Sequence, residues 1–284
     1  MKNRVIFGII GTLIALPVIF FTFTPYIDVL VFVASLASVY ELIKTFGVKN
    51  KLILALGVVF AALTVSYHAY LPYLGFDVPV ILILAVYIML LLIIMIFDFG
   101  KTTFNHAALT AFVSVVLPSS LACFLRLKNL SAVDGLVSHQ QVHYLVWLTL
   151  SSSVLTDTFA LFTGMKFGKH KMSPHISPKK TIEGAIGGVI GSTLFNLLTL
   201  FICNKAMSEP LPFGYLAIGV FSVIAAVLGI LGDLAASAIK RNYDVKDFGH
   251  IMPGHGGIMD RMDSISFVAP AVYGCTFVVL KYLS

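Results

Sequence analysis

The stretch VPVILILAVYIMLLLIIMIF, residues 78–97, contains no charged side chain and decides the class of fold. As a helix it is long enough to cross the roughly 30 Å hydrocarbon core of a bilayer, which takes about 20 apolar residues. Comparable runs recur along the whole sequence. They predict an all-α, polytopic integral membrane protein with nine spans, at residues 5–23, 26–46, 52–71, 78–97, 106–125, 142–163, 182–203, 213–239 and 264–283.

The composition supports the same class. Of the 284 residues, 58% are hydrophobic and 11% are charged, and the mean hydropathy is +0.97, whereas soluble domains typically have about 25% charged residues. The three cysteines lie in or beside apolar runs without metal-type spacing, which indicates buried apolar side chains. The first apolar run lacks a small-residue cleavage site, so we expect an uncleaved first span.

The distribution of basic residues predicts the topology. With the N-terminus in the cytoplasm, all but four of the 19 Lys and Arg residues lie on the cytoplasmic side, as the positive-inside rule requires. The net charge of +6 therefore reflects topology and affinity for anionic lipid headgroups, and we expect no nucleic-acid partner. Residues 1–130 are expected to form scaffold helices, and residues 131–284 a catalytic region with cytoplasmic loops 164–181 and 240–263.

Two predicted spans contain an aspartate. A charge within the bilayer is costly, so Asp157 and Asp233 are expected to face the protein interior and to have a role. Helical spacing places Asp233, Ser237 and either Lys240 or Arg241 on one stripe that leads toward the cytoplasm. Two alternatives stay open: Asp157 could snorkel or pair with a lysine near a helix end, and Asp233 could form an internal salt bridge without a ligand.

The cytoplasmic loop 164–181 contains five lysines. Two prolines disfavour a helix within it, and Thr181 is a candidate N-cap for the following span. Lys179 and Lys180 would then meet the amides of a helix start, an arrangement suited to phosphate. The next residues, 184–191, contain two overlapping GxxxG spacings, which favour close packing of helices within the chain or between subunits.

Residues 237–263 concentrate charge among glycines in an otherwise apolar chain. Mg²⁺ is usually held by one or two carboxylates together with phosphate oxygens and water, and Asp233 and Asp260 could supply that pair from two different spans. His255, followed by Gly256 and Gly257, suggests a backbone that wraps around a substrate, although a structural histidine is the alternative. Asp244 and Asp247 could be solvated loop charges.

These residues resemble a known family. The pattern Ser237-x-Ile-Lys-Arg-x4-Lys-Asp-x-Gly-x2-Met-Pro-x-His-Gly-Gly-Ile-x-Asp-Arg-Met-Asp263 is similar to the signature of phosphatidate cytidylyltransferase, also called CDP-diacylglycerol synthase. Residues 157–160 and 176–184 are similar to a second region of that family. Met252 departs from the preferred Leu, Ile or Phe, and Leu161 and residues 164–165 depart from an aromatic and a Gly-Arg pair.

The resemblance implies transfer of the cytidylyl group of CTP to phosphatidic acid, giving CDP-diacylglycerol and pyrophosphate. It implies that Asp233 and Asp260 hold Mg²⁺, alone or with a second cation, and that Asp157 or Asp263 supports them. The phosphates would be neutralised by Lys240, Arg241, Lys246 and Arg261, while substrate would also contact Lys179, Lys180, Ser237, His255, Gly256 and Gly257. The expected location is the bacterial cytoplasmic membrane, with the site facing the cytoplasm and a homodimer as a further expectation.

Three alternatives are weighed against this function. Another CTP-using membrane enzyme, such as a polyprenol kinase or a synthase acting on an ether lipid, would use similar charges. A CDP-alcohol phosphotransferase is disfavoured because its spaced aspartate pattern is absent from the sequence. A cation-coupled transporter would explain Asp157 and Asp233, but not the charged cytoplasmic segment that ends at Asp263.

Overall fold

The computed structural model describes residues 22–74, 79–132, 137–206, 211–249 and 256–282. Within these ranges, eight helical segments are long and apolar enough to cross a membrane. Their helices are α2 (Pro25–Thr45), α3 (Lys51–Leu74), α4 (Val80–Phe97), α5 (Phe104–Ala132), α6 (His139–Phe167), α7 (Ile182–Ala206), α8 (Tyr215–Asn242), and the short α9 (Met259–Met262) followed by α10 (Ile265–Tyr282). The all-α polytopic fold is confirmed, and the predicted span 5–23 lies almost entirely outside the described residues.

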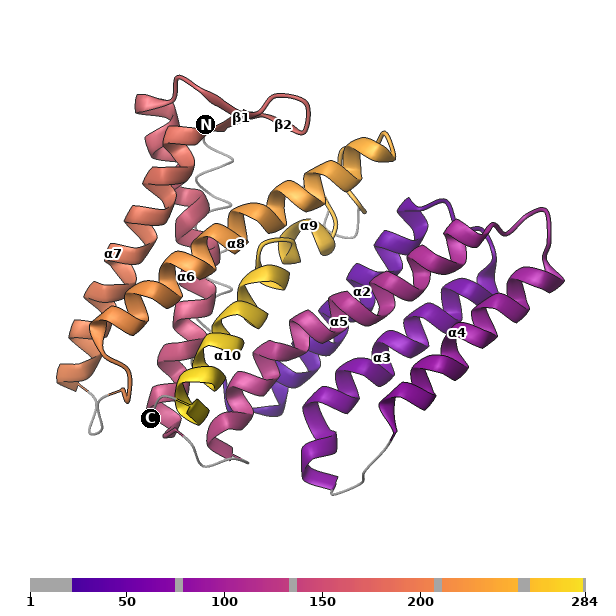
Figure 1. The fold of residues 1–284 in the computed structure, drawn as a ribbon, viewed down its shortest axis with the longest axis horizontal. Coiled ribbons are helices and arrows are strands. Elements are labelled where there is room, and N and C mark those ends of the chain that lie inside the picture. Colours follow the sequence, from indigo (N-terminus) through magenta and orange to yellow (C-terminus); the bar gives the residue numbers. More distant parts are fainter. Residues whose placement is uncertain (1–21, 75–78, 133–136, 207–210, 250–255, 283–284) are drawn as a thin grey trace.

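The helices form two groups that meet along α5 and α10 (Figure 1). One group contains α2, α3, α4 and α5, and the other contains α6, α7, α8 and α10. Leucine, isoleucine and valine side chains fill both groups and the junction between them. One buried cluster extends from α2 through α5 and α6 to α10, and a second joins α2 to α5 with the end of α8 and with Met259. The N-terminal helices therefore pack directly against the segment with the predicted signature.

The glycines of α7 pack against α6. A Cβ atom at Gly184 would lie 2.8 Å from the carbonyl oxygen of Ala160, and one at Gly188 would lie 2.7 Å from that of Thr156. The backbones of the two helices can approach this closely because glycine has no side chain there. The GxxxG spacings thus serve packing within the chain, and this face is not available for a subunit interface. The homodimer stays a prediction, but the GxxxG spacings no longer support it.

A buried polar network also fixes α6, α7 and α8 relative to one another. The side chain of Asn196 accepts a hydrogen bond from Ser151 Oγ (2.6 Å) and donates to Ser152 Oγ (3.0 Å) and Ser222 Oγ (3.3 Å). Tyr144 donates to the main-chain carbonyl of Asn196 (2.9 Å). Buried polar groups need such partners, so a sliding helix would leave several of them unsatisfied. The network therefore sets the relative register of α6 and α8, the helices that contain Asp157 and Asp233.

The loops predicted to be cytoplasmic lie at one end of the helices, at the top of Figure 1. Thr45 Oγ1 at the end of α2 donates to the carbonyl of Phe248 (3.3 Å), and Arg241 Nε donates to the carbonyl of Ile176 (3.4 Å). The latter bond joins the end of α8 to the hairpin of β1 (Lys171–Ser173) and β2 (Ser177–Thr181). Segments far apart in sequence thus meet at this end.

Candidate functional site

The predicted polar stripe on α8 is present. Ser237 Oγ lies 3.4 Å from Asp233 Oδ1 and donates to it, one helical turn away. Lys240 follows on the same side, and all three side chains are partly buried. A Cβ atom at Gly232 would lie 2.7 Å from the carbonyl oxygen of Asp263, so glycine lets the start of α10 approach this part of α8. The stripe therefore faces protein rather than lipid.

Asp260 is held by three donors. Lys240 Nζ donates to its Oδ1 (2.7 Å), and the backbone amides of Phe248 and Gly257 donate to its Oδ2 (2.9 and 3.0 Å). The side chain of Asp260 is only 8% exposed. A carboxylate with this many donors has a defined orientation. Asp260 thereby connects α9 to α8 and to the loop that precedes α9.

The glycines beside Asp260 give the backbone its shape. Gly256 has a φ of +81°, a left-handed conformation that side chains disfavour. A Cβ atom there would lie 3.1 Å from Asp260 Oδ2 and 3.3 Å from Asp247 Oδ1. Asp247 is thus placed beside the site, whereas Asp244 is exposed. His255, which the sequence predicts to contact substrate, lies outside the described residues.

Lys180 brings the second motif to the same place. Its ammonium forms an ion pair with Asp233 on α8. Thr181 Oγ1 accepts from the amide of Gly184 (3.2 Å), which confirms the predicted N-cap of α7. Glu183 accepts from the amide of His170 (3.2 Å) and from its ring Nδ1 (2.6 Å), and so closes the base of the hairpin. The predicted loop is therefore a built hairpin that holds Lys180 against α8.

Two further aspartates flank this ion pair. Asp263 is partly buried, but Asp157 is exposed, so the prediction that Asp157 faces the protein interior is wrong. Asp157 on α6 and Asp263 after α9 both lie close enough to Asp233 for their charges to interact. Asp157 also interacts with Lys180, and Asp263 with Lys240. Carboxylates from three different helical segments therefore gather around two lysines.

Further basic side chains belong to the same segments. Four of the predicted phosphate-binding cations are exposed: Lys179, Arg241, Lys246 and Arg261. Exposed cations beside a partly buried acidic cluster can attract and neutralise an anionic ligand.

The donor set fits Mg²⁺ bound together with phosphate. Among the described residues, no three His, Cys, Asp or Glu side chains form a ready-made metal cage. Mg²⁺ does not require one, because it keeps several waters and is commonly held by one or two carboxylates plus substrate phosphates. Asp233 and Asp260, the predicted pair, lie on two different elements and are linked through Asp263, whose charge interacts with Asp233 and with Lys240, the partner of Asp260.

Glu41 on α2 is a residue of this region that the sequence prediction missed. Its side chain is buried, with the residue 2% exposed, and accepts hydrogen bonds from the amides of Ile258 (3.1 Å) and Met259 (2.9 Å). The residues 1–130 therefore do more than form a scaffold. The signal was available, because a glutamate inside the predicted span 26–46 needs a polar partner just as Asp157 does.

Comparisons with known proteins identify the family of the chain. A family model described as "Cytidylyltransferase family" matches residues 2–279. The phosphatidate cytidylyltransferase of Bacillus subtilis is 30% identical over 278 residues, which cover 96% of each chain. The enzyme of the same name from Thermotoga maritima is 41% identical over 126 residues, 44% of this chain and 46% of its own. That from Staphylococcus aureus is 45% identical over 129 residues, 45% of this chain and 47% of its own. The chain therefore belongs to the cytidylyltransferase family.

Proposed function

We propose that this chain is a phosphatidate cytidylyltransferase, which transfers the cytidylyl group of CTP to phosphatidic acid and forms CDP-diacylglycerol and pyrophosphate. The observation that carries the proposal is that two ion pairs, Lys180–Asp233 and Lys240–Asp260, are linked by Asp263, whose charge interacts with Asp233 of one pair and Lys240 of the other. The names of the relatives, one of them aligned over 96% of its length, support the same activity.

The chemistry explains why so many cations are needed. A phosphate oxygen of phosphatidic acid attacks the α-phosphorus of CTP, and the bond from that phosphorus to the bridging oxygen of the β-phosphate breaks. Both reactants are anions, so their repulsion and the charge on the leaving pyrophosphate must be offset. Lys180 and Lys240 would do this from within the site, and the four exposed cations Lys179, Arg241, Lys246 and Arg261 from its solvent side. The attacking phosphate is already ionised at neutral pH, so no general base is required.

We assign a metal role to Asp233 and Asp260, with Asp157 or Asp263 in support. Mg²⁺ bound there, alone or with a second cation, would supply charge neutralisation for the phosphates. Lys180 and Lys240 form ion pairs with the same two carboxylates. Each lysine therefore lies beside a carboxylate to which we assign the metal.

The site is assigned to the cytoplasmic face of a bacterial cytoplasmic membrane. The bias of Lys and Arg supports this orientation, and the relatives named above are bacterial. CTP would reach the exposed cations from water. Phosphatidic acid would enter sideways from the leaflet, toward the face of α6 on which Asp157 is exposed.

The position of the label in CTP tests the activity. Purified protein is incubated with phosphatidic acid, Mg²⁺ and CTP that is ³²P-labelled at either the α- or the γ-phosphate. We expect the α-label in the lipid and the γ-label in pyrophosphate. A γ-labelled lipid would identify a kinase and overturn the proposal, as would an absence of labelled lipid from a folded preparation. Replacing phosphatidic acid by a polyprenol or an ether-linked phosphatidic acid decides among the alternative acceptors.

A further inference from the structure

The buried carboxyl group of Glu41 has a place in the site that the proposed chemistry does not use. We propose that Glu41 is a positioning residue: it fixes the backbone turn at residues 256–259, and through that turn the position of Asp260. The expected change in kcat rests on the proposed function, whereas the expected change in the backbone turn does not. It assigns the N-terminal group of helices a role in the geometry of the site.

The first support is how three consecutive amides are shared. The amide of Gly257 donates to Asp260 Oδ2 (3.0 Å), while those of Ile258 and Met259 donate to Glu41 Oε1 (3.1 Å) and Oε2 (2.9 Å). Each oxygen of Glu41 therefore has its own donor. The turn is clamped between two carboxyl groups, one from α2 and one from α9, so that a shift of Glu41 moves the amide that orients Asp260.

The second support is the space around Glu41. A Cβ atom at Gly249 or at Gly257 would overlap the carboxyl group of Glu41. The backbone at Gly249 and at Gly257 thus approaches this one side chain, and only glycine leaves room for it at both positions. Glu41 is enclosed by the backbone of the signature segment rather than merely adjacent to it.

The third support is that apolar packing also holds this segment at Phe248 and at Met259, which leaves Glu41 to set the precise geometry of the turn. Phe248 and Met259 are 6% and 7% exposed and belong to the apolar cluster formed with α2 to α5. Removing the hydrogen bonds of Glu41 should therefore leave the segment docked. What changes is the precision of the turn, and a site must be held within about 0.5 Å of its productive geometry.

Two variants perturb this contact in different ways. Glu41→Gln keeps the volume of the side chain but replaces one acceptor oxygen by an NH₂ donor that faces an amide. Gly249→Ala leaves Glu41 intact and displaces its carboxyl group. In metal-free protein we expect both variants to raise the rate of hydrogen–deuterium exchange in the peptide covering residues 256–262. We also expect each to lower kcat by about tenfold or more, with a smaller change in the KM for CTP.

The double variant provides an internal check. If Gly249→Ala acts through Glu41, combining it with Glu41→Gln should lower kcat by less than the product of the two single effects. Multiplying effects would show that Gly249→Ala acts elsewhere, and would overturn the clamp. If Glu41→Gln fails to fold, the hydrogen–deuterium exchange of residues 256–262 and the kcat of Gly249→Ala alone test the inference.

Asp28→Asn is the matched control, because it is also an acid-to-amide change on α2. It lies 13 residues from Glu41, about 20 Å along the helix, and should leave both the exchange of residues 256–262 and kcat unchanged. Wild-type exchange and kcat in Glu41→Gln would overturn the inference, and so would a lower melting temperature with unchanged kcat. If the wild-type protein forms no CDP-lipid, the proposed function fails, while the exchange measurement still tests the clamp.

Discussion

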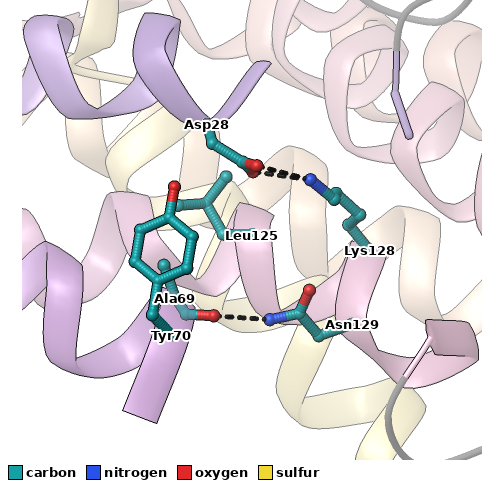
Figure 2. Close-up of a pocket in the computed structure, with 6 residues that line it drawn as sticks. All are labelled: Asp28, Ala69, Tyr70, Leu125, Lys128 and Asn129. Carbon is teal, nitrogen blue, oxygen red and sulfur yellow. Dashed lines mark hydrogen bonds and ion pairs between the residues drawn. The ribbon is translucent and has the colours of Figure 1, made fainter. Parts of the chain in front are cut away.

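Each end of the helix bundle holds a carboxylate paired with a lysine, but the two ends differ in what surrounds the pair. At the end opposite the candidate site, Lys128 Nζ donates to both oxygens of Asp28, at 2.6 and 2.8 Å (Figure 2). Beside them Asn129 donates to the carbonyl of Ala69 (3.1 Å), and Tyr70 and Leu125 complete a cavity of about 200 Å³. One cation and one anion satisfy each other there.

At the end with the candidate site, two ion pairs do not account for all the charged side chains. Lys180 and Lys240 have Asp233 and Asp260 as partners, yet Asp157 and Asp263 add two more carboxylates to the same cluster. An ion pair within a membrane span is therefore not a functional site by itself. A site is indicated where more charges meet than the fold needs for its own stability.

The largest expected effect is at Asp260. Asp260→Asn keeps the shape of the side chain but removes the charge that faces Lys240 and the proposed metal, so we expect the rate of CDP-diacylglycerol formation to fall by about a hundredfold or more. Initial rates with labelled CTP measure this, after the folded state has been checked by size-exclusion chromatography. A fall of less than tenfold would remove Asp260 from the proposed metal site.

A smaller loss of activity is expected when Lys180 is replaced, and its neighbour on β2, Lys179, allows a direct comparison. Lys180→Met removes a charged donor from the site, so kcat/KM for CTP or for phosphatidic acid should fall by about tenfold to a hundredfold. Lys179→Met removes the adjacent but exposed cation of β2 and should lower kcat/KM less than Lys180→Met does, because solvent and salt screen an exposed charge. Equal losses in both variants would mean that general positive charge matters and that the contact with Asp233 does not.

At the other end we expect a change in stability without a change in turnover. Lys128→Met leaves Asp28 partly buried and unpaired, since the two side chains are 12% and 15% exposed. This should lower the free energy of unfolding by about 3 kcal/mol, as measured by denaturation in detergent. Turnover per folded molecule should stay within about twofold of wild type. A selective loss of turnover would make this cavity part of the catalytic machinery.

The smallest effect concerns Asp98, in the turn after α4. Hydrogen bonds from Thr102 (2.6 Å) and Asn50 (2.7 Å) lower the pKa of its carboxyl below the ordinary value of 3.8. The folded state therefore favours the ionised form, which stabilises the protein above about pH 4, and this contribution is lost as the pH falls through the lowered pKa. Asp98→Asn should show a slightly smaller drop in melting temperature between about pH 5 and pH 3. An unchanged pH profile would show that the turn is too exposed to contribute.

Much of this arrangement follows from the sequence. Apolar runs predicted the spans, because the bilayer demands their length, and helical spacing predicted the stripe of Asp233, Ser237 and Lys240. Thr181 was correctly predicted as an N-cap because such caps depend only on residues within one turn. These features are local, and local physics determines them.

The parts that the sequence did not predict are long-range. Lys180 and Asp233 are 53 positions apart, and the amides bound by Glu41 are more than 200 positions from it. A glutamate inside an apolar span shows that a polar partner exists, but not which of the many backbone amides it is. Likewise, prolines excluded a helix between α6 and α7, but the hairpin also depends on Glu183 closing its base.

The same chemical change at the two ends tests the central claim most directly. Asp233→Asn and Asp28→Asn each replace the carboxylate of a lysine pair by an amide, and CDP-diacylglycerol formation is measured per folded molecule for both. We predict that Asp233→Asn loses about a hundredfold or more, while Asp28→Asn stays within about twofold of wild type. Near-normal turnover in Asp233→Asn, or equal losses in the two variants, would contradict the assignment of the cluster around Asp233 as the active site.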